Sequence, residues 1–233
     1  MKLGHWTYPI LFYKKQLILD HLIATCKKPM VSIINGIVMG GRAGLSMNTT
    51  FRIVTERAVF SMPEASMGLF PHVGANYFLS RLPGYFGEYL GLTGARLHGA
   101  EIAACGLAAH YVPSMKLESL ENALEAITSS NVSAIATLIE TFSEKGNVDE
   151  NKPFSRLEAI NKCFSKGTVE EIIQSLGSRA KLFDKDNEPK WEPSKLELVT
   201  EEMVDLFFQN VDDEEWEPLQ FPDRSHSQIA SRL

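Results

Sequence analysis

A glycine-rich turn follows a β-branched apolar run, and this feature restricts the fold more than any other. Residues 33–44 read Ile-Ile-Asn-Gly-Ile-Val-Met-Gly-Gly-Arg-Ala-Gly. Glycines let the backbone approach a ligand closely and adopt positive φ angles, so amide N–H groups can converge on an anion. If a short helix begins at Gly41, its first N–H groups and its positive dipole end add to that field. With a carboxylate at Glu64, the turn suits acyl transfer, in which an oxyanion develops.

Other glycine motifs fit this run poorly. Its glycines lack the G-x-G-x-x-G spacing of a dinucleotide site, and no G-x-x-x-x-G-K-[ST] loop is present. Residues 44–48 begin like a nucleophile elbow but lack its final glycine. A strand-to-helix turn with a purely structural role also accounts for these glycines. The neighbouring motifs are therefore needed to distinguish a structural turn from an anion-binding one.

Several motifs follow one another in a characteristic order. They are NGIVMGG at 35–41, FRIVT at 51–55, AVFSMPE at 58–64, GLFP at 68–71, RLPG at 81–84, LGLTG at 90–94 and GLAAHYV at 106–112. Together they resemble the crotonase superfamily, and within it the plant-type 3-hydroxyisobutyryl-CoA hydrolases. The resemblance is dense from about residue 22 to residue 113 and resumes at residues 184–208. It implies an α/β fold: a truncated crotonase-type β-β-α spiral followed by a helical C-terminal region.

The resemblance also implies site residues, position by position. The second oxyanion-hole amide falls on Gly41, beside Gly40, and the catalytic carboxylate of the hydrolases falls on Glu64. Their second carboxylate, an aspartate in a Phe-Pro-Asp-x-Gly pattern, falls on His72, which is a departure. A second glutamate that some hydratases carry would fall on Gly44. Its absence favours thioester hydrolysis over the addition of water to an enoyl-CoA.

Glu64 and His72 each have an ordinary interpretation as well. A glutamate after a proline is commonly exposed or caps a helix, but Glu64 lies between an apolar strand and the apolar residues 68–70. Burial there would raise its pKa and suit it to proton transfer near neutral pH. His72 is either a partly exposed loop histidine or a replacement partner that accepts a proton near pH 7. Because it cannot supply the negative charge of an aspartate, we expect impaired activity.

Two segments typical of the family have no counterpart in this sequence. Family members begin with a long β/α segment that holds the first oxyanion amide in a Gly-Gly-Asp motif, and no such motif precedes Met39. Residues 178–180 are followed at once by residues 181–185. In the family, additional helices separate the segments that correspond to these two. We therefore expect a family member without its N-terminal part and without an internal helical block.

Three functions remain open from the sequence. The first is an acyl-CoA thioester hydrolase acting on 3-hydroxyisobutyryl-CoA in valine catabolism, with Gly41 polarising the carbonyl and Glu64 activating water or attacking directly. No metal or redox cofactor is implied, because CoA arrives as part of the substrate. The second is a non-catalytic remnant that binds acyl-CoA or a full-length relative. The third is an enoyl-CoA hydratase or isomerase, which Gly44 disfavours.

The composition excludes other classes of protein. Hydrophobic residues make up 44% of the chain of 233, which is enough for a sizeable core. The net charge of −6 and the lack of a basic patch argue against nucleic acid as a partner. No run of about eighteen apolar residues predicts a membrane span. The three cysteines are unevenly spaced, so we expect no disulfide framework. The resemblance leaves a homo-oligomer possible.

The resemblance and the helical pattern that begins near residue 116 together predict two regions. Residues 1–113 are expected to form a partial crotonase core that carries the oxyanion glycine and the catalytic glutamate. Residues 114–233 are expected to form a helical region with a flexible tail. The predicted strands are 30–34, 51–55 and 58–62. The predicted helices are 11–25, 76–82, 85–92, 100–105, 117–128, 132–144, 154–164, one opened by a capping box at 168–171, and 200–208 after a linker at 181–195.

The chain ends in a targeting motif. Ser231, Arg232 and Leu233 form a close variant of the Ser-Lys-Leu peroxisomal address. The preceding residues 221–227 are polar and contain a proline, which suits an accessible tail. We therefore expect a peroxisomal protein with the import receptor as a partner. If the three residues end the chain by chance, the protein stays cytosolic.

Overall fold

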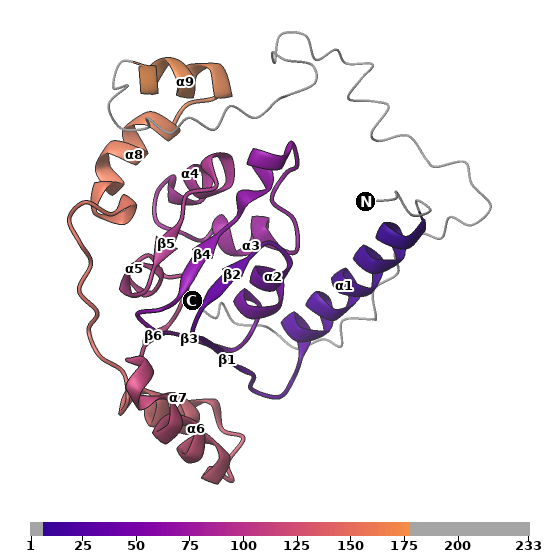
Figure 1. The fold of residues 1–233 in the computed structure, drawn as a ribbon, viewed down its shortest axis with the longest axis vertical. Coiled ribbons are helices and arrows are strands. Elements are labelled where there is room, and N and C mark those ends of the chain that lie inside the picture. Colours follow the sequence, from indigo (N-terminus) through magenta and orange to yellow (C-terminus); the bar gives the residue numbers. More distant parts are fainter. Residues whose placement is uncertain (1–6, 178–233) are drawn as a thin grey trace.

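The strands form two three-stranded sheets at the centre of the molecule (Figure 1). The structure is a computed structural model, and it describes residues 7–177. The first sheet has the order β1-β3-β6 and is parallel throughout; the second has the order β2-β4-β5, with β5 antiparallel. The strands are β1 (Val31–Ile34), β2 (Ile37–Met39), β3 (Phe51–Val54), β4 (Val59–Ser61), β5 (Leu97–His98) and β6 (His110–Tyr111).

The two sheets grow together as the chain advances. β1 and β3 pair with Val31 opposite Phe51, and β2 and β4 pair with Ile37 opposite Val59. The second turn of the chain therefore lays its first strand, β3, beside β1 and its second strand, β4, beside β2. In the next turn β5 joins β4 and β6 joins β3, so each sheet gains one further strand. This arrangement is the β-β-α spiral expected from the motifs, so the predicted α/β fold is confirmed.

Helices surround the sheets on most sides (Figure 1). They are α1 (Thr7–Thr25), α2 (Gly41–Met47), η1 (Pro63–Met67), α3 (Ala75–Leu79), α4 (Phe86–Thr93), α5 (Ala100–Ala104), η2 (Ser114–Lys116), α6 (Leu117–Ala126), α7 (Val132–Glu140), η3 (Pro153–Arg156), α8 (Leu157–Phe164) and α9 (Val169–Gly177). The predicted strands and the predicted helices as far as 168–171 agree to within a few residues. The linker, the 200–208 helix and the tail lie outside the described residues.

The capping box forms at the start of α9. The hydroxyl of Thr168 accepts a hydrogen bond from the N–H of Glu171 at 3.3 Å. The Glu171 carboxylate returns to the N–H of Gly167, one residue before the cap, at 3.0 Å. Both bonds satisfy amide groups that a helix terminus leaves without a partner.

Two apolar clusters hold the strands and helices together. The larger cluster joins β2 and β4 to α2–α5 and extends to α8 and, through Ile172, to α9, with Phe60 and Phe86 fully buried. The smaller cluster packs β3 and Val112 against α6 and α7 through residues such as Ile139. All three cysteines are free. No helix within residues 7–177 is long and apolar enough to cross a membrane.

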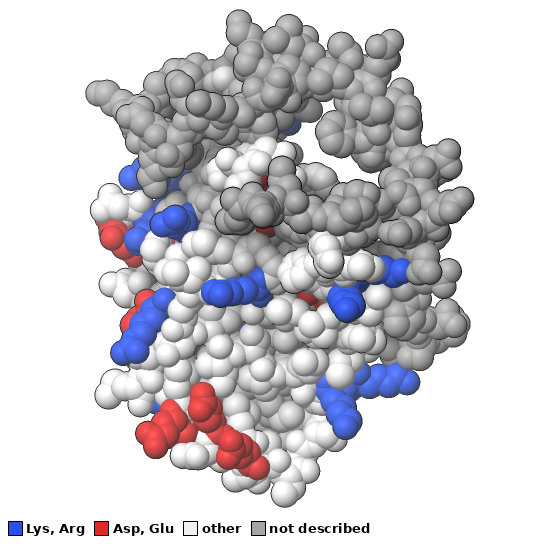
Figure 2. Space-filling view, turned by 45° about the vertical axis from the view of Figure 1, so that its right-hand side comes forward, with Lys and Arg blue, Asp and Glu red and all other residues white. Residues whose placement is uncertain are grey.

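Helix α1 lies to one side of the strands and packs against α2 (Figure 1). Turning this side forward, Figure 2 shows Lys and Arg side chains scattered over the face, two of them side by side at the lower right, while the largest group of Asp and Glu is at the lower end, where α6 and α7 lie. Charge is therefore sparse over the part of this face that the structure describes.

Candidate active site

The glycine turn joins β2 to α2, and α2 begins at Gly41, so the condition set for an anion-binding helix start is met. Gly40 stands between the two elements with φ 52° and ψ −125°, a backbone conformation that residues with a side chain seldom adopt. A Cβ atom at Gly40 would lie 3.4 Å from Oε1 of Glu64. Gly40 therefore allows a sharp turn and brings the backbone close to a carboxylate.

Glu64 is held by the short helix η1 at the end of β4. Pro63 takes the first position of η1, where its missing N–H costs no hydrogen bond. The Glu64 side chain is 1% exposed, and neither of its carboxylate oxygens has a hydrogen-bond partner among the described residues. The burial predicted from its apolar neighbours is confirmed.

His72 lies against this carboxylate. Its Nδ1 is 3.4 Å from Oε1 of Glu64, and its side chain is 24% exposed. Gly68 ends η1 in the left-handed conformation and turns the chain, so the loop that carries His72 returns towards Glu64. The structure thus brings together the two residues that the motifs assigned to catalysis. An imidazole here can donate a hydrogen bond to the carboxylate or, when protonated, pair with it.

The residue after His72 has an unusual backbone. Val73 has φ 53°, although β-branched side chains strongly disfavour positive φ. It is 1% exposed, and its Cβ would lie 2.6 Å from a Cβ built on Gly44. Such strain costs about 1–3 kcal/mol and persists only where packing holds it, typically at functional sites. Gly44 therefore permits the close approach of α2 to the 71–74 loop.

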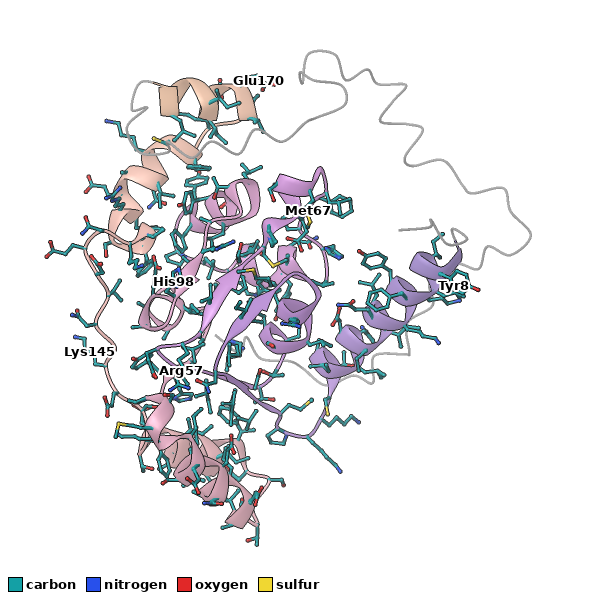
Figure 3. The ribbon with its side chains drawn as sticks, in the orientation of Figure 1. Tyr8, Arg57, Met67, His98, Lys145 and Glu170 are labelled. Carbon is teal, nitrogen blue, oxygen red and sulfur yellow. The ribbon has the colours of Figure 1, made fainter. Side chains whose placement is uncertain are left out.

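Helix α1 contributes three side chains that the motif analysis missed. The Tyr13 ring meets the His72 ring edge-on at 5.4 Å. The Gln16 side-chain amide occupies the space where a Cβ of Gly41 would stand. Oδ2 of Asp20 lies 3.0 Å from the position of a Cβ on Gly44. The spacings of three, four and seven residues place these side chains on one helix face. Only Asp20 of the three is buried, and a carboxyl group within the mostly apolar residues 17–23 was the available signal. Figure 3 labels Tyr8 near the start of α1 and Met67 at the end of η1, which locates the two elements.

Asp20 is the second buried carboxyl group near the turn. It is 5% exposed, and neither oxygen has a hydrogen-bond partner among the described residues. Burial raises its pKa from 3.8 to about 6, because transfer out of water disfavours the charged form. The carboxyl group can therefore hold or release a proton near neutral pH.

The arrangement suits chemistry on a carbonyl group. The first N–H groups of a helix have no intrahelical acceptor, so the Gly41 amide can bind a carbonyl oxygen. Glu64 stands beside the same turn as an acid, a base or a nucleophile. Within residues 7–177, no group of three or more His, Cys, Asp and Glu side chains could hold a metal ion. Residues 231–233 lie outside the described residues.

Comparison with known proteins agrees with the fold. Residues 2–178 match the family described as Enoyl-CoA hydratase/isomerase. The probable 3-hydroxyisobutyryl-CoA hydrolase 2 of Arabidopsis thaliana is 42% identical over 92% of this chain and 75% of its own length. The mitochondrial 3-hydroxyisobutyryl-CoA hydrolase of Danio rerio is 36% identical over 87% of this chain and 69% of its own. The chain therefore belongs to the enoyl-CoA hydratase/isomerase family.

A solved structure has the same fold. The carnitinyl-CoA dehydratase of Mycobacterium thermoresistibile superposes with a TM-score of 0.73 at 26% identity, covering 88% of this chain and 75% of that chain. The alignment with the Arabidopsis relative spans 283 positions, more than the 233 residues of this chain. That relative therefore carries internal residues without a counterpart here, in agreement with the internal gap inferred from the motifs.

Proposed function

We propose that the protein hydrolyses the thioester of 3-hydroxyisobutyryl-CoA, the compound named for its plant and animal relatives, and so acts in valine catabolism. The observation that carries the proposal is the Glu64 carboxylate, buried without a hydrogen-bond partner among residues 7–177 and placed against the glycine turn at Gly40. A buried carboxylate without a partner is costly to folding, and such groups are retained where chemistry needs them.

Gly41 and Glu64 take different parts in the proposed reaction. The thioester carbonyl oxygen accepts a hydrogen bond from the Gly41 N–H, which stabilises the negative charge that develops on that oxygen. Glu64 then takes a proton from water as the water oxygen attacks the carbonyl carbon, or attacks that carbon itself to form an anhydride that water opens. The carbon–sulfur bond breaks, and the sulfur takes up a proton to leave as free CoA. CoA enters as part of the substrate, and no separate cofactor is proposed.

We expect turnover to be slow, because His72 stands where the hydrolase pattern has an aspartate. The imidazole lies 3.4 Å from Glu64. It adds no second carboxylate to share the proton transfer. A protein that binds acyl-CoA without hydrolysing it is the alternative outcome.

The release of free CoA tests the proposal. The full chain is mixed with 3-hydroxyisobutyryl-CoA and a thiol-reactive dye, alongside Glu64→Gln and the exposed control Glu118→Gln. We expect CoA release from the parent and the control, and none above background from Glu64→Gln. Equal release from Glu64→Gln would show that another site hydrolyses the thioester. Hydration of crotonyl-CoA without thioester cleavage would instead favour a hydratase.

We also propose that the protein is imported into peroxisomes through Ser231, Arg232 and Leu233, on the strength of the terminal motif alone. The import receptor would then be a partner. Self-association, or association with a full-length relative, is a further proposal that rests on the family resemblance. Light scattering of the purified chain measures the mass of the assembly.

A further inference from the structure

One face of helix α1 is apolar and exposed. Its apolar side chains recur every three or four residues and are 47% to 70% exposed: Tyr8, Leu11, Phe12, Leu19 and Leu22. Lys15, which is also exposed, stands in the middle of them. Since each residue turns an α-helix by about 100°, these six positions fall within a sector of roughly 100° of the helix surface. We call them the α1 stripe.

The α1 stripe is separate from the face of α1 that packs on the site. Tyr13 meets the ring of His72, and Gln16 fills the space over Gly41. These two residues lie about 120° around the helix axis from the middle of the stripe. Helix α1 lies at the margin of the described molecule (Figure 1). A continuous exposed apolar face of this kind commonly marks a surface that another segment or another protein covers.

The spacing within the stripe indicates the shape of its partner. Tyr8, Phe12, Lys15, Leu19 and Leu22 follow one another at intervals of four, three, four and three residues. This alternation is the spacing of the core positions of a coiled coil, where each side chain fits between side chains of a facing helix. A helix with the same spacing of apolar residues therefore suits the stripe best.

The charge of Lys15 disfavours a second copy of α1 as that partner. Lys15 is midway between Tyr8 and Leu22. Two copies of the stripe that pair over their full length, parallel or antiparallel, would therefore place Lys15 beside Lys15. Like charges facing each other destabilise a helix pair, whereas a carboxylate opposite Lys15 would stabilise it. The stripe thus favours a helix that is apolar on one face and acidic beside it.

Residues 196–208 of the same chain have this pattern. They lie outside the described residues and read Leu-Glu-Leu-Val-Thr-Glu-Glu-Met-Val-Asp-Leu-Phe-Phe, with four carboxylates and no Lys or Arg. Leu196, Val199, Met203 and Leu206 recur at intervals of three, four and three residues. On a helix, Glu202 would border this apolar face, because it follows Val199 by three residues and precedes Leu206 by four.

The connection to this segment is long enough to reach α1. Helix α9 ends at Gly177, and residues 178–195 lead from there to Leu196. A chain of about 18 residues can extend over roughly 60 Å. A compact body of about 170 residues is only about 40 Å across. The segment can therefore reach α1 even if α1 and α9 lie on opposite sides of the molecule.

We propose that residues 196–208 pack as a helix on the α1 stripe, with Glu202 paired to Lys15. The apolar contact provides most of the stabilisation, and the exposed ion pair fixes the orientation of the segment. Helix α1 is then held on two faces, by the glycine turn on one and by this segment on the other. The segment thereby secures the helix that carries Tyr13 and Gln16 beside the site.

Hydrogen exchange of the α1 amides in the full chain tests this contact. Met203→Asp puts a charge on the apolar face of the segment and should raise the exchange rate of α1 about tenfold or more. Leu198→Asp, the same kind of change on the other side of the predicted helix, is the matched control and should leave the rate unchanged. An unchanged rate for strand β3 verifies that each variant is folded.

A charge reversal tests the proposed pairing. Lys15→Glu is a surface change and should raise the exchange rate of α1 at least about threefold, because it faces an acidic segment. Adding Glu202→Lys should restore the rate of the parent. This rescue also decides the matter if Met203→Asp disturbs the whole fold.

Three outcomes would overturn the proposal. The first is an α1 exchange rate that responds equally to Met203→Asp and Leu198→Asp. The second is a Lys15→Glu effect that Glu202→Lys does not reverse. The third is α1 protection that increases when the protein concentration is raised tenfold, together with a dimer mass in light scattering, which would assign the stripe to a second copy. Protection that is independent of concentration supports packing within one chain.

Discussion

Oε1 of Glu64 lies 3.4 Å from Nδ1 of His72, so the buried carboxylate of this site faces an imidazole. The two residues are eight positions apart and come together because the chain turns back after η1. In the hydrolase pattern a carboxyl group would stand at the position of His72. Two carboxyl groups at this distance share a proton, whereas a protonated imidazole favours the charged form of its neighbour.

His72→Asp should therefore increase hydrolysis of 3-hydroxyisobutyryl-CoA. A second carboxyl group beside Glu64 raises the proton affinity of the pair, which suits it to proton transfer near neutral pH. We expect kcat/KM to rise at least about tenfold in the thiol-release assay. The double variant with Glu64→Gln should be inactive, which serves as the control. A rate equal to or below that of the parent would show that His72 does not limit the reaction.

Asp20 should make the protein less stable as the pH rises. Its pKa is about 6 in the folded state against 3.8 as the ordinary value, so between these values the folded chain binds more protons than the unfolded chain. The free energy of unfolding therefore falls from pH 4 to above pH 6, by up to about 3 kcal/mol. Below about pH 4 Asp20 is protonated in both the folded and the unfolded chain, so its burial then causes no loss of stability from ionisation.

Urea unfolding at several pH values measures this effect. Asp20→Asn cannot ionise, so the difference between parent and variant should grow from about pH 4 to pH 7, in favour of the variant. The other charged or titratable groups on the elements that pack around Asp20 are Arg42 on α2, His72 in the loop, and Tyr8, Tyr13, Lys14, Lys15 and His21 on α1. They are identical in both proteins, so their titration largely cancels. A difference that does not change with pH would contradict the raised pKa.

Gly44→Ala should destabilise the fold. The new methyl group would lie 2.6 Å from Cβ of Val73 and 2.9 Å from its carbonyl oxygen, and the backbone of this strained residue cannot move cheaply. We expect a loss of about 1–3 kcal/mol in the free energy of unfolding. Gly36→Ala is the matched control, because a Cβ there meets nothing within 4 Å. It should change stability by less than about 0.5 kcal/mol. Equal effects of the two changes would refute the packing argument.

A fluorescent protein fused to the N-terminus, which leaves Leu233 free, should give puncta that coincide with a peroxisomal marker. Removing residues 231–233 should make the signal diffuse, because the import receptor reads a free terminal tripeptide. Puncta that persist after the deletion would rule out this address.

The amino-acid sequence by itself determined the framework of the fold and two positions of the site. The β-branched runs at 31–34 and 51–54 form strands as predicted, because their length and apolar character suit strands buried in a parallel sheet. The start of α2 at Gly41 and the burial of Glu64 also follow from local signals, namely the glycine pair and the apolar residues on both sides.

The tertiary structure decided which segments meet. β5 and β6 have two residues each, too few for any alternating pattern, and they become strands only because β4 and β3 offer open edges. The contact of Asp20 with the Gly44 position joins residues 24 apart in the chain. Helical periodicity indicates that Asp20 lies on a particular face of α1, and only the packing of α1 against α2 determines what that face covers.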